Sequence, residues 1–153
     1  PHSIEIIAYG GLDEDVAGAI FRRKAAGIQT YGNTSVSVVS SAGTTHKIKF
    51  SRPTPVNVWV KITGLKTDSV FPLDGIDRIK QNIVEYIGSN TRGGMAIGQD
   101  VICVTLPTEV LKVPGVVDFD LQISSNGSVF SRENITIAAR EKAVTDESKV
   151  TVE

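Results

Sequence analysis

The chain has 153 residues, of which 41% are hydrophobic and 22% are charged, close to the averages of soluble globular proteins. A chain of this length forms one ordinary domain or two small ones. Its 16 basic and 17 acidic side chains give a formal net charge of -1, which excludes a broad electrostatic attraction for nucleic acid or anionic lipid. We therefore expect neither nucleic acid nor a membrane among its partners.

Residues 1–52 are predicted to form a β-α-β-β subdomain. The β-forming residues 4–9 stop at Gly10-Gly11, which is typical of a strand followed by a turn. Asp13 is predicted to be the N-cap of a helix, because acidic residues follow it and basic residues precede Gly27, the expected C′ position. The helix face that packs on the sheet is expected to carry Val16, Ala19 and Ile20.

A hairpin completes this first subdomain. Residues 35–39 and 47–50 alternate between apolar and polar side chains on either side of a small polar connector. The prolines of Arg52-Pro53-Thr54-Pro55 then interrupt the pattern, because proline lacks an amide donor and favours extended backbone. We place the boundary between two subdomains here, the second covering residues 53–153.

The second subdomain begins like the first. Residues 56–64 predict a strand with a valine and isoleucine face, and Trp59 lies on the opposite face. Asp74 is expected to cap a helix that Gly88 closes. Its core stripe is formed by isoleucines three and four residues apart: Ile76, Ile79, Ile83 and Ile87.

The remaining sequence predicts short elements. A glycine-rich loop, residues 89–98, leads to an apolar region that Pro107 should break into short helical pieces. Residues 117–123 and 135–139 alternate around a Ser-Asn-Gly turn and predict a second hairpin, and residues 149–152 predict a short strand. The expected fold class is α+β, with mixed sheets in two small subdomains and helices packed on one face of each.

Residues that could bind metal or act as a nucleophile are few. His2, His46 and Cys103 are too scattered for a structural zinc site, so no cofactor is expected. His46, beside the hairpin turn, is expected to be an exposed polar side chain rather than a catalytic one. Cys103 lies in an apolar run, where a buried, protonated thiol is favoured over a nucleophile.

Two charged or glycine-rich features each allow a binding interpretation. Gly10-Gly11 before a helix could cradle a phosphate, but the acidic first turn favours a purely structural role. The basic run Arg22-Arg23-Lys24 could contact nucleic acid, but it also complements the negative end of the helix dipole, and no aromatic platform accompanies it.

One carboxylate pair could in principle act as an acid and a base. Asp118 and Asp120 alternate along a predicted strand and so share a face. The solvated face of a half-buried strand explains the same pattern, and we favour it. No catalytic residue, and hence no enzyme and no small-molecule substrate, is predicted.

Three residues are candidates for a protein interface. Trp59 either contacts a second layer of the fold or awaits a partner, and its sequence position does not separate the two. Gly93 and Gly94 belong to a loop that either orders against a partner or stays exposed to solvent.

Several short motifs, taken in order, resemble the C-terminal region of baseplate J-like proteins, which are phage tail wedge components. The resemblance spans roughly residues 6 to 140, and its motifs are mostly glycine, proline and capping positions. They are Gly10-Gly11, Asp15-Val16-Ala17, Ala19-Ile20, residues 24–32, Phe50-Ser51-Arg52-Pro53-Thr54, Asp74-Gly75-Ile76, Ile97-Gly98-Gln99-Asp100-Val101-Ile102 and Val113-Pro114-Gly115-Val116.

The resemblance implies a structural protein of a phage or prophage tail baseplate. Such a protein assembles with copies of itself, as a homo-oligomer in the particle, and with neighbouring wedge proteins. It would occupy the virion tail baseplate, and the cytoplasm of the bacterial host before assembly. The alternative is a cell-surface or carbohydrate-binding module, to which hairpins and loops rich in Ser, Thr and Asn lend themselves.

Overall fold

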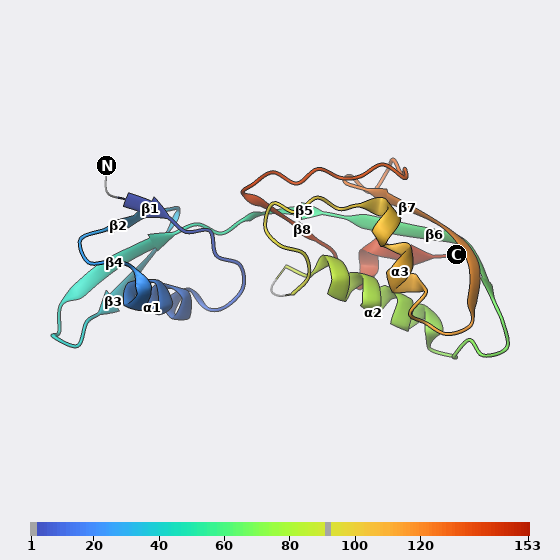
Figure 1. Ribbon diagram of the computed structural model, residues 1–153, viewed down its shortest axis with the longest axis horizontal. Helices are drawn as coiled ribbons and strands as arrows, with labels where there is room; N and C mark the ends of the chain where they lie inside the picture. Colours follow the sequence, from blue (N-terminus) through green and yellow to red (C-terminus); the bar gives the residue numbers. More distant parts are fainter. Residues whose placement is uncertain (1–2, 91–92) are drawn as a thin grey trace. The chain divides into compact units, whose positions relative to one another are not determined.

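The computed structural model describes residues 3–90 and 93–153, and it has an α+β fold. The chain divides into two compact units, Pro1–Pro53 and Thr54–Glu153, one residue beyond the boundary expected from the sequence. Figure 1 shows that each unit has its own helix and its own strands. We describe the two units separately.

The described residues of the first unit, from Ser3 on, form one helix and four strands. The strands are β1 (Ser3–Glu5), β2 (Gln29–Tyr31), β3 (Thr34–Val39) and β4 (Thr45–Phe50). β1 pairs with β2 in parallel, and β3 pairs with β4 as the predicted antiparallel hairpin. The predicted first strand is shorter than expected, because beyond Glu5 only Ile7 makes an isolated bridge, to Ser51.

Helix α1 (Asp13–Arg23) differs at both ends from its prediction. The N-cap is Leu12, so Asp13 is the first helical residue and caps nothing with its side chain. The helix ends at Arg23 with Lys24 in extended backbone, so Gly27 (φ +80°) belongs to the following turn rather than to a C-cap.

One face of α1 packs on the β3–β4 hairpin. The buried residues of this unit are Ala17, Ile20, Ile48 and Phe50, with partly buried neighbours around them. The predicted hairpin face is confirmed, but the predicted helix face is wrong at Ala19, which is exposed while Ala17 is fully buried. The tertiary packing therefore turns the helix slightly from the position that its apolar spacing indicated.

The second unit, apart from its residues 91–92, has five strands in two sheets. β7 (Val116–Ser124), β6 (Trp59–Thr67) and β9 (Val150–Val152) form one sheet in that order, and β5 (Thr54–Asn57) pairs with β8 (Glu141–Val144) in the other. The predicted strand over residues 56–64 is thus shared between β5 and β6, and β6 continues past Gly64 through a register shift. Val58, Val60 and Ile62 are fully buried, as their alternation predicted.

Helix α2 (Gly75–Ile87) supplies the other half of this core. Ile79, Ile83 and Ile87 are fully buried, whereas Ile76 is 43% exposed, so the predicted stripe is one residue too long. The helix lies between Asp74 and Gly88, as predicted, but the Asp74 side chain makes no capping hydrogen bond and accepts one from Arg78 Nε instead. Two short helices follow on either side of Leu106, η1 (Cys103–Thr105) and α3 (Pro107–Val110), where Pro107 was expected to break the chain.

The second predicted hairpin is wrong. Strand β7 pairs with β6, and in the described part of the chain the returning segment forms isolated bridges in place of a strand ladder, Ile123 with Ser131 and Val101 with Ile135. Its apolar residues still point inward, because Ile137 is buried, but their backbone does not form a ladder. A short helix, η2 (Glu147–Lys149), precedes β9. The presence of β9 confirms the predicted last strand. Across residues 3–90 and 93–153, every helix is too short or too polar to cross a bilayer.

Candidate functional site

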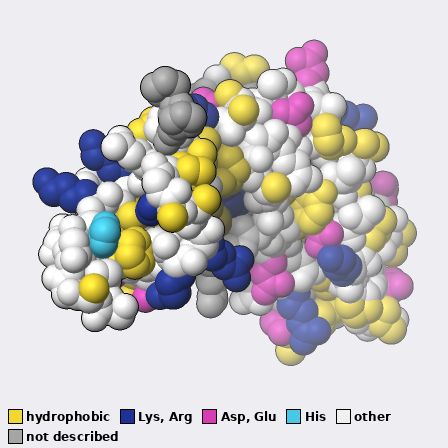
Figure 2. Space-filling view, turned by 60° about the vertical axis from the view of Figure 1, so that its left-hand side comes forward, with side chains coloured by type: hydrophobic (Ala, Val, Ile, Leu, Met, Phe, Trp, Pro, Cys, Tyr) yellow, Lys and Arg dark blue, Asp and Glu magenta, His cyan; other side chains and the backbone are white. Residues whose placement is uncertain are grey.

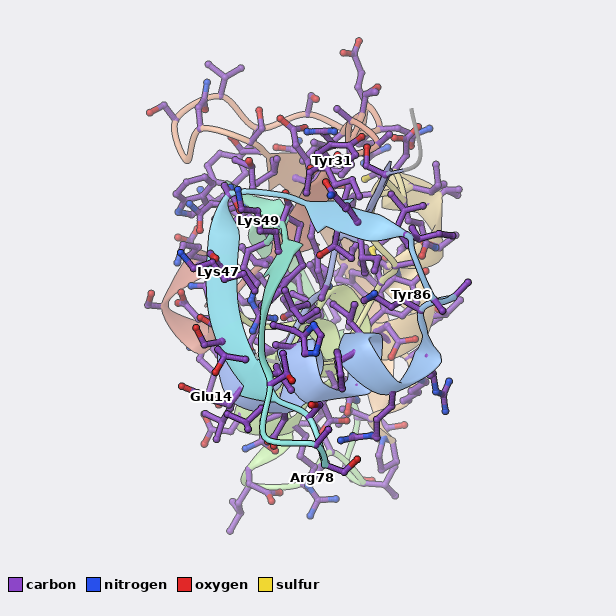
Figure 3. The ribbon with its side chains drawn as sticks, turned by 90° about the vertical axis from the view of Figure 1, so that its left-hand side faces the viewer. Glu14, Tyr31, Lys47, Lys49, Arg78 and Tyr86 are labelled. Atoms are coloured by element: carbon purple, nitrogen blue, oxygen red, sulfur yellow. The ribbon has the colours of Figure 1, made fainter. Side chains whose placement is uncertain are left out.

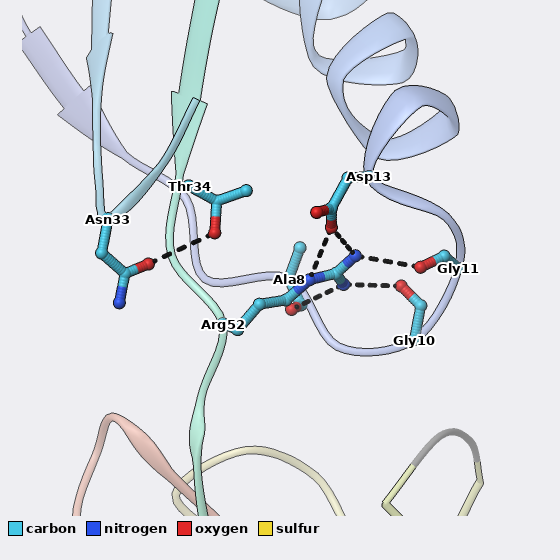
Figure 4. Close-up of polar contacts among 7 residues, drawn as sticks. All are labelled: Ala8, Gly10, Gly11, Asp13, Asn33, Thr34 and Arg52. Atoms are coloured by element: carbon cyan, nitrogen blue, oxygen red, sulfur yellow. Dashed lines mark hydrogen bonds and ion pairs between the residues drawn. The ribbon is translucent and has the colours of Figure 1, made fainter. Parts of the chain in front are cut away.

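The most elaborate polar cluster of the first unit centres on Arg52 (Figure 4). Its Nη1 donates hydrogen bonds to the carbonyl oxygens of Ala8 (3.1 Å) and Gly10 (2.7 Å). Its Nη2 donates to the carbonyl oxygen of Gly11 (2.9 Å) and to Oδ1 of Asp13 (2.6 Å), and Nε donates to the same Oδ1 (3.2 Å). All five N–H groups of the guanidinium are therefore committed to this chain.

This geometry assigns the Gly10-Gly11 turn a structural role. Both glycines have φ +71°, a backbone region that other residues avoid, and their carbonyl oxygens point at the guanidinium. A phosphate would need amide N–H groups instead. Arg52 also lies over the Phe50 ring, 5.1 Å from its centroid, so the cluster joins the turn to the core of the unit.

The basic run at the end of α1 borders a hollow in the first unit. Its lining combines these three basic residues, Arg22, Arg23 and Lys24, with the apolar side chains of Ile4, Ile6, Ala19 and Ile20. Lys24 Nζ donates to the carbonyl oxygen of Ile28 at 3.1 Å. The dipole interpretation of this run still holds, since Arg22 and Arg23 occupy the last turn of the helix.

His46 is less exposed than expected. It is half-buried on β4, and its ring centroid lies 4.9 Å from that of Phe21. Figure 2 shows the imidazole (cyan) at the surface with hydrophobic side chains beside it. The histidine therefore packs against the aromatic ring as well as facing solvent, which corrects the prediction of a simply exposed side chain.

The two carboxylates on β7 do not form an acid and base pair. Asp118 binds Lys66 Nζ at 2.8 Å, and Asp120 binds Arg132. The hydrogen bond from Lys66 holds the pKa of Asp118 below its usual value, and the same bond raises the pKa of Lys66. Each carboxylate thus has its own cation as partner, which suits a solvated strand face.

Cys103 is buried at the start of η1, as expected. Burial is the main reason that the pKa of its thiol is raised, so the protonated form dominates at neutral pH. The thiol borders a hollow together with Val104, Phe119 and the Asp120–Arg132 pair. A protonated thiol beside an ion pair is not an activated nucleophile.

Trp59 packs against the turn at Gly127 and against η2 of its own unit. Gly127 lies so close that a Cβ there would be 2.9 Å from Cε2 of the indole, and Lys149 Nζ is 6.0 Å from the ring centroid. The side chain is half-buried. The part of the ring that stays exposed remains a candidate contact for a partner.

Gly93 and Gly94 have different surroundings. Both have φ +74°, but a Cβ at Gly94 would lie 2.2 Å from the carbonyl oxygen of Ile87, whereas at Gly93 it would meet nothing within 4 Å. Gly94 is therefore needed for a close backbone approach to the end of α2. The two residues before Gly93, which belong to the predicted loop, lie outside the described part of the chain.

Lys142 is a buried residue that the sequence did not single out. It is 2% exposed on β8, and its Nζ donates to the carbonyl oxygen of Met95 at 2.8 Å, beside Gly94. Burial lowers the pKa of this amine. The sequence gives no signal for its burial. A single lysine within a short strand is normally solvated, and no periodic pattern marks this one as different.

The described residues contain no group of three or more His, Cys, Asp or Glu side chains that could hold a metal ion. The sequence candidates are also dispersed: His46 belongs to the first unit, and Cys103, Asp118 and Asp120 to the second. No protein-family model matches the chain, and comparison with curated proteins found no significant match.

Proposed function

We propose that this chain is a structural module of a phage or prophage tail baseplate, where it assembles with copies of itself and with neighbouring wedge proteins. The observation that carries the proposal is the role of the motifs that resemble baseplate J-like proteins. They fix backbone geometry and supply no reactive groups.

The Arg52 cluster is the clearest case. Two separate motifs, Gly10-Gly11 and the segment around Arg52, meet through three hydrogen bonds to carbonyl oxygens, two of them from the glycines. The order of these motifs in the sequence is thus matched by a contact in the fold. A sequence that kept one motif by chance would have no reason to keep its partner.

The later motifs behave in the same way. Gly98 N donates to the carbonyl oxygen of Glu141 at 2.8 Å, and Asp100 Oδ1 accepts from Ile137 N at 2.7 Å, so this motif anchors the chain that returns to β8. Gly115 (φ +83°) accepts a hydrogen bond from Asp68 N at 2.8 Å and begins the turn into β7. These are positions that a family conserving architecture would need.

Purified particles provide the test. We expect peptides of this chain in tail particles isolated from the bacterium that produces it, in a fixed ratio to the tail tube and wedge proteins. Mass spectrometry with labelled standard peptides measures that ratio. Particles that are complete and infectious or contractile without this chain would refute the proposal.

Glycan binding separates the alternative. A carbohydrate-binding module would retain specific glycans on an array and would be absent from purified tail particles. A baseplate module is expected to give the opposite result in both measurements.

A further inference from the structure

Strand β3 has an edge with none of the usual protection against pairing. It is six residues long, contains no charged residue and no proline, and pairs with β4 in an unbroken register. Within the part of the chain that the structure describes, no hydrogen bond joins its other side to a further strand. Natural proteins normally blunt such an edge with charge, proline, a bulge or a covering segment.

The hydrogen-bonding residues of this edge follow from the register. Ser40 N donates to the carbonyl oxygen of Thr44 at 2.9 Å, one pair beyond the end of the ladder. Because hydrogen-bonded pairs alternate in an antiparallel ladder, residues 34, 36 and 38 bond to β4. The N–H and C=O groups of Ser35, Ser37 and Val39 therefore point away from β4.

We propose that β3 pairs with β3 of a second copy of this chain, antiparallel and about a two-fold axis through Ser37. In this register Ser37 faces the second copy's Ser37, and Ser35 faces the second copy's Val39. Every outward-pointing residue then meets another outward-pointing residue, so each facing pair exchanges two backbone hydrogen bonds. The two hairpins become one continuous four-stranded sheet.

The side chains of β3 fit a second copy. On the exposed face the paired positions carry only serine and valine, and Val39 is 64% exposed before pairing. On the helix face Val36 and Val38 are half-buried, and each would gain a valine of the second copy as its neighbour. The edge carries no charge, and its valines are only partly buried, so the same edge of a second copy would cover them.

Charge does not oppose this pairing. Lys47 and Lys49 project from β4, which is the strand of the hairpin that lies away from the proposed interface (Figure 3). In the joined sheet the lysines of the two copies lie three strands apart, about 14 Å. That separation exceeds the Debye length of about 8 Å at physiological ionic strength, so their repulsion is largely screened.

This inference goes beyond the proposed function, because it rests on β3 alone. If the chain dimerises through β3 but is absent from tail particles, the inference stands and the baseplate proposal fails. If the chain is found in particles but does not pair through β3, the baseplate proposal stands and this inference fails.

Cysteine crosslinking tests the register directly. In Ser37→Cys the two thiols face each other across a pair with Cα atoms about 5.5 Å apart, within the range of a disulfide. In Ser35→Cys the two new thiols lie about 14 Å apart, too far to join. We expect Ser37→Cys to form a covalent dimer under mild oxidation at least about tenfold faster than Ser35→Cys. The unmodified chain measures the background from buried Cys103.

A charged substitution tests the interface without a new thiol. Ser37→Lys places two lysines opposite each other, which should abolish the concentration-dependent dimer in sedimentation velocity at up to about 1 mM protein, since an interface of this size is weak. Ser41→Lys, in the exposed hairpin turn, is the matched control and should leave it intact. The proposal would be overturned if the two cysteine variants crosslink equally. It would also be overturned if the unmodified chain stays monomeric at this concentration. The second result would instead favour a strand from a different protein.

Discussion

Replacing Arg52 by alanine is expected to destabilise the first unit by about 3–4 kcal/mol. The guanidinium makes three hydrogen bonds to backbone carbonyl oxygens, and each such bond contributes about 1 kcal/mol net. The ion pair with Asp13 adds less than about 1 kcal/mol, because the two side chains are 28% and 49% exposed.

The lysine variant separates charge from geometry. Arg52→Lys keeps the positive charge near Asp13 but loses the planar fork that reaches Gly10 and Gly11 together. We expect it to recover no more than about half of the loss seen with alanine. Lys47→Ala, which removes an exposed β4 side chain, should change stability by less than about 0.5 kcal/mol.

Native-state amide exchange monitored by NMR localises the effect. In Arg52→Ala the amides of Ala8 and Ser51, which bond across this part of the first unit, should exchange roughly 100- to 1000-fold faster, the factor that a loss of about 3–4 kcal/mol gives. The amides of β6 and the fluorescence of Trp59, in the second unit, should not change. Unchanged protection at Ala8 and Ser51, or equal loss in both units, would refute the reasoning.

Three further predictions concern the second unit. Because the pKa of Lys142 is lowered in the fold, the unfolded chain binds more protons than the folded chain between that pKa and 10.5. The free energy of unfolding should therefore rise with pH across this window, and Lys142→Met should flatten the rise when both proteins are unfolded with urea. An equal slope in both proteins would contradict this reasoning. Gly94→Ala should lower the free energy of unfolding by at least about 3 kcal/mol, since its Cβ would strike the carbonyl oxygen of Ile87. Gly93→Ala should lower it by only about 1–2 kcal/mol, because only the positive φ is unfavourable there. Similar melting temperatures for the two variants would count against this packing. Cys103 should react with a thiol reagent only as fast as the fold opens, and labelling at the rate of a free thiol would show that it is not buried.

The sequence was informative where a local pattern and the tertiary packing agree. The alternation of β3 and β4 and the isoleucine spacing of α2 each place one apolar face toward a core, so they predicted real elements. The second hairpin failed because alternation shows which side chains point inward but not which strand supplies hydrogen bonds. Residues 135–139 bury Ile137 without forming a ladder, and β7 takes β6 as its neighbour instead.

The sequence by itself determined the α+β class, the β3–β4 hairpin and the position of α2, because glycine, proline and side-chain periodicity act within a few residues. Only the tertiary structure decided the partners of Arg52, Asp118 and Lys142. Arg52 reaches back 39 to 44 residues along the chain, and Lys66 meets Asp118 across 52 residues. Contacts over such separations depend on strand order and register, which no local pattern encodes.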